Sequence, residues 1–191
     1  MKLAVFLRNM LGEINYSVLM SKIKVHKFLK KYYSESNTCG QNAKQVYIYM
    51  ADGKINHGGL VDRLRGLVAL YDYCKQFDKE FKVNFISPFL LENILSPNKY
   101  NWVLDKNMIS YNRKDAIPIY INNSPNYAEQ IAQRLLSVKQ KQVHVYTNMT
   151  YDEEQFSSLF FELFKPGKRL QELIGRLCVY YFSISAIIGG F

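Results

Sequence analysis

The fold is decided by residues 45–77, which read QVYIYMADGKINHGGLVDRLRGLVALYDYCKQF. Residues 46–50 form an apolar, tyrosine-rich run with the length of a buried strand. Turn-forming residues follow over 52–59, and apolar residues then recur at helical spacing from about Leu60 to Phe77. A strand that passes through a glycine pair into a helix is common in α/β folds. There the helix start offers backbone N–H groups and the positive end of its dipole to an anion.

The loop and the first turns of this helix supply the candidate substrate-binding residues. Glycine allows the backbone to approach a phosphate closely, and a guanidinium group can donate two parallel hydrogen bonds to phosphate oxygens. The pattern assigns no catalytic residue and predicts no bound metal or cofactor. The candidate binding residues are His57, Gly58, Gly59, Asp62, Arg63 and Arg65.

Each candidate also has a purely structural interpretation. The glycine pair suits a tight strand-to-helix turn even without a ligand. Arg63 and Arg65 are two positions apart, so on a helix they point to different faces, and at most one is expected to face a ligand. A loop histidine such as His57 often makes a structural hydrogen bond, and Asp52 fits a turn residue better than a general base. His144, between two valines, is expected to be a hydrogen-bonded core histidine.

The rest of the chain alternates predicted strands and helices, which is typical of a parallel sheet with crossover helices. The apolar segments 101–109 and 116–121 fit either a hairpin or two separate strands. The predicted fold class is therefore α/β, a single Rossmann-like domain with a mostly parallel sheet over residues 45–191, preceded by a basic helical arm. Further strands are expected at 82–87, 142–147 and 179–188, and further helices at 89–95, 124–138, 151–164 and from Gly167 to about Leu177.

Length and charge limit the possible partners. The 191 residues suit one domain, and a net charge of +9 fits nucleic acid, an anionic membrane or a phosphorylated small molecule. Nucleic acid is disfavoured because the basic residues concentrate at the amino terminus and no binding module is recognisable. Three scattered cysteines without a C-x-x-C pair predict neither disulfides nor a zinc site, and they fit a reducing cytoplasm.

Residues 1–33 are expected to form a basic amphipathic helical arm, which the polar residues 34–44 link to the domain. Glu13 is the single acidic residue among the first 31. Two interpretations stay open: a peripheral anchor on the anionic inner face of a membrane, or a helix packed on its own domain with a solvated lysine face. The basic residues of the arm are Lys2, Arg8, Lys22, Lys24, Lys27, Lys30 and Lys31.

The segment HGGLVDRLRG, from His57 to Gly66, resembles the glycine-rich loop that opens the first domain of a group of fucosyltransferases. The group comprises bacterial α-1,2 and α-1,6 fucosyltransferases with nodulation and protein O-fucosylation enzymes. A second segment, FFELFKPGKRL at Phe160 to Leu170, resembles the stretch before the donor-domain strand in the same group. The resemblance runs from about Gln45 to the end of the chain. It implies two Rossmann-like domains in a GT-B-like arrangement, with GDP-fucose as donor and a cell-surface glycan as acceptor.

Two features depart from that family pattern. Val61 stands where many members have a glycine, and the strand expected at Tyr181 to Ser185 is followed by AIIGGF without the arginine that a donor domain supplies. The resemblance therefore implies the amino-terminal half of such an enzyme, active only when a second domain completes it. The alternatives are a non-catalytic truncated domain and an unrelated nucleotide-binding Rossmann protein. The absence of a G-x-G-x-x-G fingerprint counts against the last of these.

Overall fold

The computed structural model describes residues 2–33, 44–55, 58–121, 135–148 and 154–177. At its centre is a four-stranded sheet in the order β2-β1-β5-β4. All three strand pairs are parallel, so the chain has an α/β fold with a Rossmann-like parallel sheet, as the sequence predicts. The strands are β1 (Val46–Ala51), β2 (Glu80–Phe85), β4 (Ala116–Ile121) and β5 (Gln142–Thr147).

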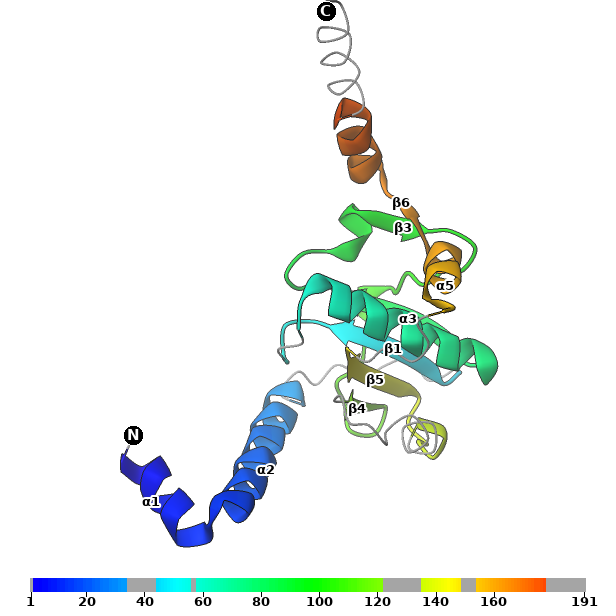
Figure 1. Cartoon of the computed structure of the whole chain (residues 1–191). Coiled ribbons are helices and arrows are strands. Elements are labelled where there is room, and N and C mark those ends of the chain that lie inside the picture. Colours follow the sequence, from blue (N-terminus) through cyan, green and yellow to red (C-terminus); the bar gives the residue numbers. More distant parts are fainter. Residues whose placement is uncertain (1, 34–43, 56–57, 122–134, 149–153, 178–191) are drawn as a thin grey trace, which may run out of the picture.

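Helix α3 (Leu60–Gln76) covers one face of this sheet (Figure 1). Side chains alternate between the two faces of a strand, so Tyr47 and Tyr49 pack in the core beside α3, whereas Ile48 and Met50 pack on the opposite face. Helix α5 (Phe156–Leu163) packs against α3. The first predicted strand and the helix after the glycine pair are confirmed, each to within a residue at its ends.

A second, two-stranded antiparallel sheet is formed by β3 (Leu95–Pro97) and β6 (Phe164–Pro166). The helix predicted at 89–95 is wrong, because only the 3-10 turn η1 (Leu91–Asn93) forms before the chain pairs with β6. Of the two alternatives for 101–121, the hairpin is wrong, since β4 pairs in parallel with β5.

The segment 101–109 forms no extended strand. It makes one β-bridge, between Val103 and Val83, and then the 3-10 turn η2 (Lys106–Met108). Asp105 caps this turn by accepting the backbone N–H of Asn107. The indole N–H of Trp102 donates to the Leu163 carbonyl at 2.9 Å, which ties this segment to the end of α5.

Some predicted elements lie partly or wholly outside the described residues. Helix α5 begins at Phe156, five residues after the predicted start, and residues 151–153 are among those that are not described. The helix predicted at 124–138 is described only from residue 135, and the strand predicted at 179–188 lies outside. Residues 168–177 form the expected helix.

The arm consists of two helices, α1 (Lys2–Leu11) and α2 (Glu13–Tyr32), which meet at Gly12. The φ of Gly12 is 75°, a left-handed conformation that favours glycine and breaks the helix there. Figure 1 shows α2 running away from the sheet, with α1 turning back from its far end. None of the helices that the structure describes is long and apolar enough to cross a membrane.

The carboxyl-terminal end of α2 belongs to the core of the domain. Tyr32 is fully buried and packs with Ile48 and Tyr111 on the sheet face opposite α3. The ring centroids of Phe28 and Tyr146 lie 5.4 Å apart in an edge-on contact. The division into an arm at 1–33, a linker at 34–44 and a domain at 45–191 stays a prediction, and these contacts show that the arm's last turn packs on the sheet.

Candidate functional site at the carboxyl edge of the sheet

The carboxyl ends of the parallel strands lie at one edge of the sheet, where open α/β folds bind their ligands. The described residues of the loop after β1, 52–55 and 58–59, lie at this edge beside the start of α3. The chain after β2 reaches the same edge. So do Tyr120 and Ile121, the last two residues of β4. The sequence-predicted binding loop is therefore in the position that the fold makes available for a ligand.

Asp52 is the first residue after β1, and its carboxylate is fully engaged within the chain. Its Oδ1 accepts the backbone N–H of Lys54 at 3.0 Å, which closes a turn. Its Oδ2 accepts the hydroxyls of Tyr146 at 3.0 Å and Tyr111 at 3.5 Å. The pKa of Tyr146 is raised far above its usual range, mainly by burial and next by the negative charge of Asp52, so this hydroxyl remains a donor. Asp52 is thus a turn residue, as expected.

The amino terminus of α3 is occupied by the chain's own carboxylate. Oδ2 of Asp62 accepts the backbone N–H of Gly59 at 3.1 Å, which is half of a capping box. A Cβ atom built on Gly58 would lie 2.6 Å from the same oxygen, so the bare backbone of Gly58 allows Asp62 to fold back. An anion approaching the helix start would meet this negative charge first.

Arg63 links two loops of the edge instead of projecting into solvent. Its Nε donates to the Gly58 carbonyl at 3.2 Å, and its Nη1 donates to the Ser87 carbonyl, just after β2, at 2.6 Å. Arg65, by contrast, is exposed. The structure therefore brings together Gly58, Gly59, Asp62 and Arg63, whereas Arg65 makes no hydrogen bond or ion pair within the described residues. His57 lies outside the described residues.

Gly66, at the end of the same motif, has a role that the sequence prediction missed. A Cβ atom at this position would lie 2.7 Å from the Thr147 carbonyl carbon and 2.8 Å from the Cα of Asn148. Helix α3 can therefore approach the end of β5 this closely only because residue 66 has no side chain. The signal in the sequence was a glycine inside an otherwise regular helical pattern.

On the opposite face, a buried hydrogen-bond network surrounds His144. Its Nδ1 lies 2.8 Å from the Tyr32 hydroxyl, and its Nε2 lies 3.0 Å from Oε1 of Gln142. That oxygen also accepts the Ser110 N–H, so Nε2 of His144 carries the proton and Nδ1 accepts from Tyr32. Burial lowers the pKa of His144 to about 3, which keeps the ring neutral. The predicted core role of this histidine is confirmed.

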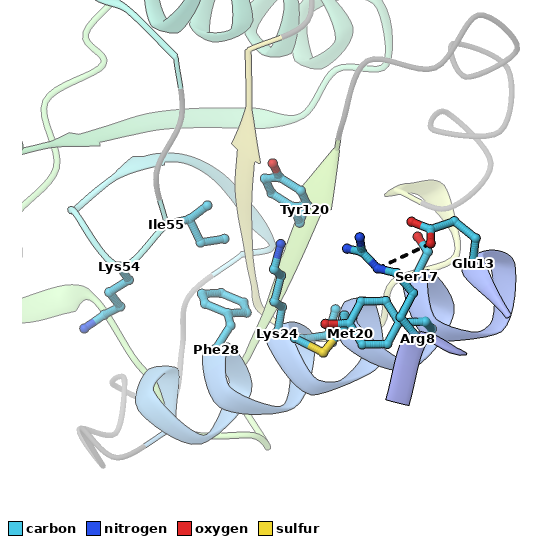
Figure 2. Close-up of a pocket in the computed structure, with 11 residues that line it drawn as sticks. Arg8, Glu13, Ser17, Met20, Lys24, Phe28, Lys54, Ile55 and Tyr120 are labelled. Atoms are coloured by element: carbon cyan, nitrogen blue, oxygen red, sulfur yellow. Dashed lines mark ion pairs between the residues drawn. The ribbon is translucent and has the colours of Figure 1, made fainter. Parts of the chain in front are cut away.

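A cavity of about 760 Å³, the arm cavity, lies between the arm and the carboxyl edge (Figure 2). Residues from α1 and α2, from the loop after β1 and from the end of β4 line it together. No described group of three or more histidine, cysteine, aspartate or glutamate residues is arranged to hold a metal ion. The lining residues are Arg8, Glu13, Tyr16, Ser17, Met20, Lys24, Val25, Phe28, Lys54, Ile55 and Tyr120.

Neither known protein families nor curated proteins yield a match to this chain. Among solved structures, the fold is similar to that of a mutant of the Arabidopsis thaliana fucosyltransferase FUT1 in complex with GDP, at a TM-score of 0.47 and 13% sequence identity. The match covers 81% of this chain and 44% of that chain, so this sequence spans less than half of the solved chain it resembles.

Proposed function

We propose that this chain is a glycosyltransferase-related domain that binds a GDP-sugar donor. Completed by a second domain, it would transfer fucose from GDP-fucose to a cell-surface glycan acceptor. One observation carries the proposal: in HGGLVDRLRG, the segment that resembles the fucosyltransferase loop, Gly58 and Gly59 lead into the first turns of α3 at the carboxyl edge of a four-stranded parallel sheet. The motif therefore occupies the edge at which α/β folds bind nucleotides.

The two arginines of the motif differ in their surroundings, and we propose a different role for each. Fucosyl transfer expels GDP, so negative charge grows on the β-phosphate and must be met by positioned cations or N–H donors. Arg63 already donates to the Gly58 and Ser87 carbonyls, which suits it to fixing the shape of the loop. Arg65 is exposed on the same helix turn, and we assign the diphosphate contact to it.

Isothermal titration calorimetry with GDP and GDP-fucose tests this proposal on the full chain. Arg65→Gln should weaken GDP binding about tenfold, the effect of losing one hydrogen bond to a charged group. The matched control is Arg176→Gln, an exposed arginine on the helix at residues 168–177. If no heat is detected at millimolar GDP, this chain does not bind the donor, and a non-catalytic domain becomes the better account.

The arm supports a peripheral location at the anionic inner face of a membrane, on the cytoplasmic side. Its lysines at 22, 27 and 30 are exposed, and each basic residue near such a surface adds about 1 kcal/mol of attraction. Deleting the arm would be an ambiguous test, because Phe28 and Tyr32 pack into the domain. The better test is vesicle flotation of the intact chain with Lys22, Lys27 and Lys30 changed to glutamine. Unchanged binding to anionic vesicles would refute an electrostatic anchor.

A further inference from the structure

The arm cavity is assembled from parts that are far apart in the sequence. Arm residues form one wall, Lys54 and Ile55 of the loop after β1 form another, and Tyr120 near the end of β4 lies opposite α2. Its volume of about 760 Å³ is within the range of pockets that hold small molecules. It touches the carboxyl edge of the sheet, but from the side opposite α3, and none of the residues from Gly58 to Gly66 lines it.

The charged groups of the arm cavity favour an anion. Three cationic side chains and one carboxylate line it. Nε of Arg8 lies 3.3 Å from Oε2 of Glu13, and the Lys54 ammonium lies 4.5 Å from the centre of the Tyr111 ring. Lys24 makes no hydrogen bond or ion pair within the described residues, and Figure 2 shows it extending from α2 towards Tyr120. The positive charge of Lys24 is therefore available to a ligand.

Apolar side chains continue from this lysine along the arm. Met20, Val25, Phe28 and Ile55 line the cavity beside Lys24. Further along the arm, α1 and the start of α2 leave large apolar side chains exposed. A single ammonium group next to an apolar wall is complementary to a phosphate that carries an alkyl chain. The exposed apolar residues are Val5, Phe6, Met10 and Ile14.

We propose that the arm cavity binds the phosphate group of an amphiphile, with the phosphate at Lys24 and the first part of the alkyl chain against Met20, Val25 and Phe28. The inference deepens the proposed membrane role of the arm and rests on it for the natural source of the ligand. That source is either a phospholipid headgroup in a bilayer or a free phosphate-bearing lipid, and the chemistry recognised is the same.

Titration of the full chain with short-chain lipids below their micelle concentration tests the cavity itself. Dihexanoyl phosphatidic acid should bind, whereas inorganic phosphate and dihexanoyl phosphatidylcholine should bind at least about tenfold more weakly. Inorganic phosphate lacks the alkyl chains, and the headgroup of phosphatidylcholine has no net negative charge. Lys24→Gln should weaken phosphatidic acid binding about tenfold. Lys27→Gln removes the same charge from an exposed site outside the cavity and should change affinity less than about twofold. Equal affinity of the two variants would overturn the proposal.

Flotation with vesicles separates the two sources and the two proposals. If the bilayer is the source, Lys24→Gln should reduce binding to vesicles containing phosphatidic acid more than Lys27→Gln does. If both variants lose vesicle binding equally, the arm acts as a diffuse charged surface, and the cavity proposal fails while the membrane proposal stands. If neither variant nor the unmodified chain binds vesicles, the membrane proposal fails, and the short-chain titration alone decides whether the cavity takes a free lipid phosphate. Both variants should unfold like the unmodified chain, as followed by the fluorescence of Trp102, the single tryptophan.

Discussion

The hydroxyl of Tyr32 lies 2.8 Å from Nδ1 of His144, inside the core, and so joins the end of the arm to strand β5. The two residues are 112 positions apart in the sequence. Both side chains are fully buried, which means that neither polar group can turn to water if its partner is lost. This bond, together with the aromatic contacts around Tyr32, makes the last turn of α2 part of the folded domain.

Removing that hydroxyl should destabilise the protein. Tyr32→Phe leaves the ring in place but leaves the buried Nδ1 of His144 without a donor, which costs about 1–3 kcal/mol. Urea unfolding followed by Trp102 fluorescence measures the loss. Tyr33→Phe is the control, because its hydroxyl makes no hydrogen bond within the described residues. Equal stability of the two variants would show that the Tyr32 hydroxyl contributes nothing to folding.

The free energy of unfolding should decrease as the pH is lowered from neutral, because of His144. Burial lowers its folded pKa to about 3 from the ordinary 6.5, so the unfolded chain takes up a proton first as the pH falls through 6.5. Proton uptake by the unfolded state reduces stability progressively down to pH 3, by about 2 kcal/mol at pH 5 relative to pH 8. Unfolding free energies at these two pH values measure the effect. In His144→Gln the difference should shrink by a similar amount, and an unchanged difference would assign it to other groups.

The sequence predicts correctly those elements whose conformation is determined by their own residues. Strands β1 and β5 and helix α3 each carry their own periodicity, so their positions are predicted closely. The segment 101–109 is apolar enough for a strand, yet its conformation depends on the bond from Trp102 to Leu163, which no local pattern reveals. At the candidate site, too, a contact from a distant part of the chain could not be predicted. Arginine next to a glycine pair predicts anion binding, but the Ser87 carbonyl that holds Arg63 comes from another strand end.

Gly66 should tolerate no side chain. In Gly66→Ala the new methyl group would overlap the Thr147 carbonyl, so α3 or β5 must shift at a cost of about 3 kcal/mol. Gly175→Ala is the matched control: nothing lies within 4 Å of a Cβ atom built at that position, and the change should be neutral or stabilising by up to about 1 kcal/mol. Thermal unfolding of both variants compares the two sites. A Gly66→Ala protein as stable as the unmodified chain would mean that α3 packs less closely on β5 than these distances indicate.

Arg63 and Arg65 should separate loop stability from ligand binding. Arg63→Ala removes two hydrogen bonds to backbone carbonyls, one of them joining the start of α3 to the chain after β2, and should cost about 1–3 kcal/mol of unfolding free energy. Arg65→Ala removes an exposed side chain and should change stability by less than about 0.5 kcal/mol. Arg63→Lys should recover part of the loss, since a lysine can reach one carbonyl but cannot donate in two fixed directions. If Arg63→Ala leaves stability unchanged and Arg65→Ala lowers it, the roles assigned to the two guanidinium groups are reversed, and Arg63 becomes the group available to a diphosphate.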